Sequence, residues 1–175
     1  AGRGIGRVTA ELLSSRGAKV MAVARSENEL RSLGLDYCVA DLGTPEGCNH
    51  AVNQTHDRLG PVEVLVCNHG IGSAHERVIW EQGPEVWRDT MRINLDGPYL
   101  LSQGVLKDMV VRGYGRLVFT SSTAGQVAEH AGSAYNSSKH GLLGLMRSVA
   151  RDAGAFGVTS NAVLPGWVKT PMADA

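Results

Sequence analysis

Short apolar runs alternate along this chain with longer amphipathic segments, and this alternation limits the possible folds more than any other feature. The apolar runs cover residues 19–24, 37–40, 62–67, 116–120 and 158–164. The segments between them are long enough for helices. Strands that alternate with helices are typical of a parallel α/β sheet. The nearly continuous Val/Leu run at 62–67 further predicts a strand that is buried on both faces.

Local signals predict where several helices begin. Ser26 and Glu29 have the spacing of a capping box. Thr44-Pro45 predicts a helix start with proline at the first helical position. Residues 84–112 form a long, largely apolar helical segment, and residues 133–153 form another.

Composition excludes several classes of function. A length of 175 residues predicts one domain, residues 1–175. Seventeen basic and seventeen acidic residues cancel, so neither nucleic acid nor a membrane is expected as a partner. The apolar runs are far shorter than the roughly 20 residues that span a bilayer. The three cysteines and six histidines lack the spacing of metal ligands, so no metal site is predicted. The odd number of cysteines favours reduced thiols in a cytoplasmic protein.

Tyr135 and Lys139 stand four residues apart in a predicted helix, so they share one face. A lysine ammonium beside a phenol should lower the pKa of the phenol from about 10 toward neutrality. Ser122 precedes Tyr135 by thirteen positions (135 − 122), and a serine hydroxyl there could meet the phenol over a carbonyl group. A surface tyrosine over a solvated lysine is the alternative for the pair taken alone. Ser121 is the rival of Ser122, and we expect it to be structural.

The first six residues, Ala1-Gly2-Arg3-Gly4-Ile5-Gly6, lead into apolar positions at helical spacing. Glycines before a helix let the backbone approach a pyrophosphate, which binds the N–H groups at the positive helix end. Asn68-His69-Gly70 follows one predicted strand, and Pro165-Gly166 follows another and precedes Thr170.

These motifs, in this order with Asn94, Ser122, Tyr135 and Lys139, resemble the classical short-chain dehydrogenase/reductase family over essentially the whole chain. The resemblance implies a Rossmann-type, doubly wound parallel sheet in three α/β/α layers. Gly4 and Gly6 match the second and third glycines of the family's T-G-x-x-x-G-x-G pattern. We therefore expect an internal fragment that is truncated at both ends and lacks the first strand.

The resemblance also implies catalytic roles. Tyr135 would be the acid/base, Lys139 would lower its pKa and bind the ribose, and Ser122 would polarise the carbonyl. Asn94 would interrupt its helix and hold a water in the proton relay, although a solvated helical asparagine is the alternative.

An NADP(H) site is implied on the same grounds. An NAD-selecting member carries an acidic residue at the end of this strand, where the present chain has Ala24 followed by Arg25. Arg3 can reach the same side, and two guanidinium groups suit a phosphate dianion. Two solvated arginines are the alternative. Asp41 and Leu42 would contact the adenine, unless Asp41 caps a helix. Further cofactor contacts are implied for Gly4, Ile5, Gly6, Asn68, Gly70, Tyr135, Lys139, Pro165, Gly166, Val168 and Thr170.

The implied activity is hydride transfer between NADP(H) and a small ketone, aldehyde or secondary alcohol. The stretch from Pro165 to Met172 is similar to those of 3-oxoacyl, polyketide and polyol reductases, and the loops at 71–81 and 125–132 should line the substrate pocket. The alternatives are an epimerase or dehydratase of the same family and a non-catalytic NADP-binding module. Apolar residues on more than one face of 84–112 and 133–153 predict a homodimer or homotetramer.

Overall fold

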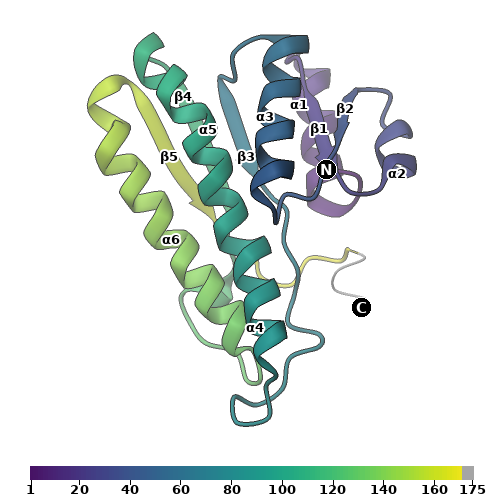
Figure 1. Cartoon of the computed structure of the whole chain (residues 1–175), viewed down its shortest axis with the longest axis vertical. Coiled ribbons are helices and arrows are strands. Elements are labelled where there is room, and N and C mark those ends of the chain that lie inside the picture. The colour runs from purple at the N-terminus through teal and green to yellow at the C-terminus, as the bar shows by residue number, and fades with distance from the viewer. Residues whose placement is uncertain (171–175) are drawn as a thin grey trace.

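The computed structural model describes residues 1–170, and it is an α/β structure in which parallel strands alternate with helices (Figure 1). The helices are α1 (Gly4–Ser15), α2 (Glu27–Arg31), α3 (Pro45–Leu59), α4 (Pro84–Met91), α5 (Gly97–Arg112) and α6 (Ser133–Ala153). The strands are β1 (Met21–Ala24), β2 (Asp36–Val39), β3 (Val64–Cys67), β4 (Gly115–Thr120) and β5 (Val158–Val163). No helix among these residues is both long enough and apolar enough to cross a bilayer.

The strands form two parallel sheets where we expected one. One sheet pairs β1 with β2, and the other has the order β3-β4-β5. Within residues 1–170, β1 and β3 make no ladder with each other. The amino group of Ala1 donates to the Val23 carbonyl at 2.6 Å, so it satisfies one acceptor of β1 that no strand satisfies.

The main core lies between the three-stranded sheet and helices α5 and α6. Leu117 and Phe119 alternate with less buried residues along β4 and are fully enclosed against Met109 of α5 and Leu142 of α6. Figure 1 shows α3, α5 and α6 on the near side of the strands and α1 behind them. Val64 of β3 is 47% exposed, so the prediction that its strand is buried on both faces is wrong at that end.

Two helix starts test the capping predictions. Thr44 caps α3, because its hydroxyl accepts the Gly47 N–H at 3.0 Å and Pro45 holds the first helical position, as predicted. Ser26 precedes α2 but makes no side-chain cap bond, so the capping box is wrong. The helix α2 has only five residues, and its charged side chains bond one another instead: Arg31 donates to Glu27 at 2.9 Å.

The long helical segment at 84–112 is not one α-helix. A π-helical turn, Arg92–Asp96, separates α4 from α5, and the buried side chain of Asn94 lies in this turn. A π-turn inserts one extra residue into the helix and is frequent at functional sites. The expected interruption at Asn94 is therefore present.

Candidate active site

Three of the predicted catalytic residues come together where β4 ends and α6 begins. Ser122 follows β4, and its hydroxyl accepts the Ala124 N–H at 3.1 Å. The same hydroxyl lies near enough to the Tyr135 phenol to influence its pKa. Lys139 lies one turn after Tyr135 on α6, with Nζ 5.5 Å from the centre of the phenol ring. Ser121 points elsewhere: its hydroxyl donates to the Lys139 carbonyl at 3.0 Å, in the structural role that we expected.

The pKa of Tyr135 is raised, which corrects the lowering that we expected from Lys139. Burial disfavours the phenolate, the nearby Ser122 hydroxyl opposes this effect, and the negative charge of Glu129 adds to the rise. The ammonium of Lys139 donates to the Thr120 carbonyl at 2.9 Å rather than to the phenol. The phenol is therefore held in its protonated form, which can donate a proton.

Lys139 itself is enclosed, with 5% of its surface exposed. Burial lowers the pKa of its ammonium to about 8. The Thr120 carbonyl meets one of its three N–H donors. A cation in this position favours negative charge on neighbouring atoms.

Asn94 joins the π-turn to two other parts of the site. Its Oδ1 accepts the Ile71 N–H at 2.8 Å, and its Nδ2 donates to the Ile71 carbonyl at 3.0 Å and to the Ser138 hydroxyl at 3.1 Å. A Cβ atom at Gly70 would lie 3.1 Å from Asn94 Oδ1 and 3.6 Å from Lys139 Nζ. Asn94, Gly70 and Lys139 are thus neighbours. The solvated alternative for Asn94 is wrong.

The glycine segment meets Asn68 and Thr170 at the start of α1. Gly4 has φ +56°, in the region that favours glycine, and a Cβ atom there would lie 3.5 Å from Thr170 Cβ. A Cβ atom at Gly6 would lie 2.7 Å from Asn68 Nδ2. The N-cap residue Arg3 makes no side-chain cap bond. A hollow of about 400 Å³ lies beside this turn, lined by Gly4, Ile5, Arg7, Val8, Thr9, Val168, Lys169 and Thr170.

This geometry fits a dinucleotide. The missing side chain at Gly4 leaves the backbone beside the hollow accessible to a ligand, while the missing side chain at Gly6 lets Asn68 pack against the start of α1. The first N–H groups of a helix without a side-chain cap suit a pyrophosphate.

The residues expected around the adenosine are less tightly grouped. Arg3 and Arg25 are both exposed. The Asp41 carboxylate accepts the Gly43 N–H at 3.0 Å and lies 3.5 Å from Arg92, and the Gly43 bond is the main cause of its lowered pKa. Asp41 therefore holds a turn, while α3 is capped by Thr44. Leu42 is partly buried and packs against the main core and against a smaller cluster of Cys38, Ala40 and Ala51.

The segment after β5 runs beside the serine. The Thr123 N–H donates to the Pro165 carbonyl at 3.1 Å, and a Cβ atom at Gly166 would lie 4.0 Å from Thr123. Trp167 is 87% exposed and Val168 is 41% exposed. Met172 lies outside the described residues.

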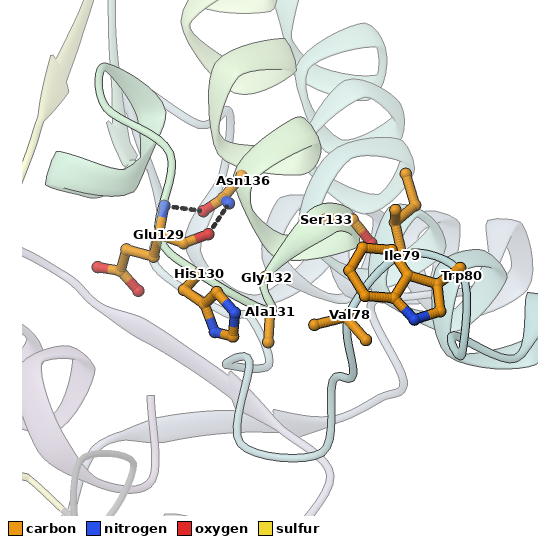
Figure 2. Close-up of a pocket in the computed structure, with 9 residues that line it drawn as sticks. All are labelled: Val78, Ile79, Trp80, Glu129, His130, Ala131, Gly132, Ser133 and Asn136. Atoms are coloured by element: carbon orange, nitrogen blue, oxygen red, sulfur yellow. Dashed lines mark hydrogen bonds between the residues drawn. The ribbon is translucent and has the colours of Figure 1, made fainter.

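A second hollow of about 310 Å³ lies between the two loops that we expected to line the substrate pocket (Figure 2). Figure 2 shows the side chains of Val78, Ile79 and Trp80 on one side and those of Glu129, His130 and Ala131 on the other, with Asn136 bonded to the main chain of Glu129. Ala131, at its edge, has φ +49°, which is strained for a residue with a side chain. The lining residues are Val78, Ile79, Trp80, Glu129, His130, Ala131, Gly132, Ser133 and Asn136.

Two further residues lie near the site, Glu76, which the sequence analysis missed, and His69, which it did not expect to be catalytic. Glu76 is buried, and its carboxylate bonds the first turn of α6. The Nε2 atom of His69 is enclosed and has no hydrogen-bond partner among the described residues, and burial lowers the pKa of the ring to about 4. No local sequence signal set Glu76 apart, because His75, Arg77 and Glu81 of the same loop are polar too. Residues 1–170 hold no cluster of three metal-binding side chains.

Comparisons with known proteins agree with this geometry. Residues 1–175 match the family described as short chain dehydrogenase. The chain is 32% identical to the 3-oxoacyl-acyl-carrier-protein reductase FabG of Escherichia coli (strain K12), and the match covers 100% of this chain and 73% of the relative.

Two solved structures extend the likeness to the fold. A variant of actinorhodin polyketide ketoreductase with NADPH superimposes with a TM-score of 0.91 at 35% identity, over 98% of this chain and 69% of the other. Levodione reductase superimposes with a TM-score of 0.95 at 30% identity, over 99% and 71%. These likenesses establish the Rossmann-like fold, and the chain belongs to the short-chain dehydrogenase family.

Proposed function

We propose that the protein is an NADP(H)-dependent reductase of small ketones or aldehydes, and that it oxidises secondary alcohols in the reverse direction. The observation that carries the proposal is the position of the Tyr135 phenol beside Ser122, with the buried ammonium of Lys139 5.5 Å from the centre of its ring. We take residues 1–175 as one domain that holds both the cofactor and these catalytic residues.

Tyr135 is the proton donor in this proposal. When bound, the nicotinamide supplies the hydride that the carbonyl carbon accepts. The phenol gives its proton to the carbonyl oxygen, so a neutral alcohol forms and the tyrosine becomes a phenolate. Its raised pKa suits this direction, because the phenol stays protonated until an acceptor arrives. Ser122 donates a second hydrogen bond to the same oxygen.

Lys139 and Asn94 support the proton transfer. The ammonium of Lys139 stabilises the phenolate electrostatically and can bind a ribose hydroxyl with its remaining donors. Both N–H donors of Asn94 are already used, by Ile71 and Ser138, and Oδ1 keeps one free lone pair. That lone pair is where we assign the relay water.

Gly4, Ile5 and Gly6 would hold the pyrophosphate at the start of α1, and Asn68, Gly70, Pro165, Gly166, Val168 and Thr170 would line the nicotinamide half. Asp41 and Leu42 would border the adenine. Arg3 and Arg25 favour the phosphate of NADP(H) over NAD(H), and the related ketoreductase structure contains NADPH. The substrate class that we propose for the present protein is broad and comprises 3-oxoacyl, polyketide and polyol carbonyl compounds.

We also propose a homodimer or homotetramer in the cytoplasm. The argument from α6 is weaker than we expected, because Leu142, Leu143 and Val149 are buried within the chain. Trp87, Tyr99 and Val111 of α4 and α5 remain exposed and could meet a second copy. Sizing with light scattering on the full-length protein measures the assembly, and a monomer would refute it.

The deciding experiment follows NADPH oxidation by the full-length protein against a panel of ketones and aldehydes. Tyr135→Phe removes only the hydroxyl, so turnover should fall at least about 100-fold while NADPH still binds. Turnover retained in this variant would show that another group is the acid. A wild-type protein that binds NADPH and reduces no member of the panel would favour the non-catalytic module instead.

A further inference from the structure

Glu76 connects the loop after β3 to the first turn of α6. Its Oε2 accepts the Ala134 N–H at 2.9 Å, and its Oε1 accepts the Tyr135 N–H at 2.7 Å. The side chain is buried, with 6% of its surface exposed. A carboxylate 59 residues earlier in the sequence therefore holds the main chain of the tyrosine that we propose as the acid.

The helix α6 has no cap of its own. Its N-cap residue is Gly132, which offers no side chain, and the first turn contains no acidic residue. The first N–H groups of a helix need acceptors from outside the helix and favour negative charge. In residues 1–170, no lysine, arginine or histidine pairs with the Glu76 carboxylate. The partners of the buried carboxylate are therefore the first N–H groups of α6.

The loop that carries Glu76, residues 71–83, is attached to the site at two points. At its start, the main chain of Ile71 bonds Asn94 through both its N–H and its carbonyl. Five residues later, Glu76 bonds the Tyr135 N–H. Just beyond Glu76, residues 78–80 line the second hollow together with Gly132 and Ser133 at the start of α6 (Figure 2).

We propose that Glu76 is a positioning residue that sets the location of the Tyr135 phenol by tying the first turn of α6 to loop 71–83. Through this contact, a molecule that rests on residues 78–80 would also influence the tyrosine. The proposal rests on the proposed function, because it takes Tyr135 as the proton donor.

The test is Glu76→Gln in the full-length protein. The amide NH₂ can only donate, so one of the two helix N–H groups loses its acceptor. We expect kcat to fall at least about tenfold, while the NADPH Kd and the KM of the carbonyl substrate stay within about twofold. Hydrogen exchange should speed up together in residues 72–83 and 133–137. Gln82→Ala is the matched control, because it removes the contact between Gln82 and the Arg77 N–H and leaves α6 untouched.

Two results would overturn the proposal. One is an unchanged kcat. The other is faster hydrogen exchange in residues 133–137 without a change in residues 72–83 of the loop, because Glu76 would then be only a helix cap. A wild-type protein without carbonyl reductase activity would refute the proposed function, and the exchange pattern would still decide whether Glu76 joins the two segments. Should Glu76→Gln fail to fold, Glu76→Asp is measured in the same way. It keeps the charge but is one methylene too short to reach both N–H groups.

Discussion

At the scale of single residues, Arg25 determines the prediction on cofactor choice. It follows β1, where this architecture meets the adenosine ribose, and its charge reaches Asp41, whose pKa is lowered first by the Gly43 N–H and further by Arg92 and Arg25. A guanidinium–phosphate contact contributes about 1.5–3 kcal/mol, or about 10- to 150-fold in affinity. Arg25→Asp should therefore weaken NADPH binding by that factor and spare NADH, as measured by fluorescence titration.

Arg16→Asp is the matched control for Arg25. Arg16 is also exposed, but it lies at the opposite end of α1 from the glycine segment. Equal affinity of the unmodified protein for NADPH and NADH would refute the assignment.

His69 predicts a loss of stability in acid. Its pKa is lowered to about 4, chiefly by burial and also by the Lys139 ammonium, while an unfolded chain has the ordinary value of 6.5. As the pH falls from about 6.5 to about 4, His69 binds a proton in the unfolded state but stays neutral in the folded state. The free energy of unfolding should then fall by at most about 3 kcal/mol. His69→Ala should flatten this slope in urea titrations between pH 7 and pH 4.

His50 is the control histidine, because it is exposed on α3. A wild-type protein whose stability does not vary between pH 7 and pH 4 would show that His69 is solvated.

The spacing of Ser122, Tyr135 and Lys139 predicted that these residues meet. Their relative positions depend mainly on local structure, namely the end of one strand and one face of the following helix. The spacing did not predict the direction of the Tyr135 pKa shift. That shift depends on burial and on where the lysine donates its hydrogen bond, and both come from distant parts of the chain. Glu76 was missed for the same reason: its partners lie 58 and 59 residues away.

At the scale of elements, the π-turn around Asn94 predicts the effect of one substitution. Asn94→Ala leaves the N–H and carbonyl of Ile71 without their partner. An unsatisfied buried group costs about 1–3 kcal/mol, and we expect a loss of that size in urea unfolding of the full-length protein. Asn53→Ala, on the exposed face of α3, should change the stability by less than about 0.5 kcal/mol. Equal losses of stability from Asn94→Ala and Asn53→Ala would mean that water takes over the hydrogen bonds between Asn94 and Ile71.

Helices were easier to predict from the sequence than strands. The start of α3 and both bounds of α6 agree with the prediction, since helix-start residues and periodicity are local signals. The strands β1 and β3 begin two residues later than predicted, at Met21 and Val64. A strand extends only where a neighbour pairs with it, and Val64 is the first residue of β3 that pairs with β4.

At the scale of the whole molecule, the separation of β1 from β3 predicts how the 175 residues behave alone. Each of these strands has one edge that no strand in residues 1–170 pairs with, and each unpaired backbone group costs about 1–3 kcal/mol if it is dry. Several such groups rival the whole stability of a domain, about 5–15 kcal/mol. Expressed alone, this chain should aggregate or fold partly, without NADPH binding or reductase activity.

Sizing, circular dichroism and NADPH fluorescence on the purified 175 residues check this. A soluble chain that unfolds cooperatively and binds NADPH would show that the two edges close on each other.

The helix α3 acquires a particular importance from this arrangement. It packs against β1 and β2 on one side and against α5 on the other, so it links the two sheets. Proteins open in cooperative units whose free energies differ, and a boundary without a ladder is a natural border between two such units. The half with β1 and β2 and the half with β3, β4 and β5 would then unfold as separate cooperative units. Because α3 contacts both halves, the unfolding of one half would change the stability of the other.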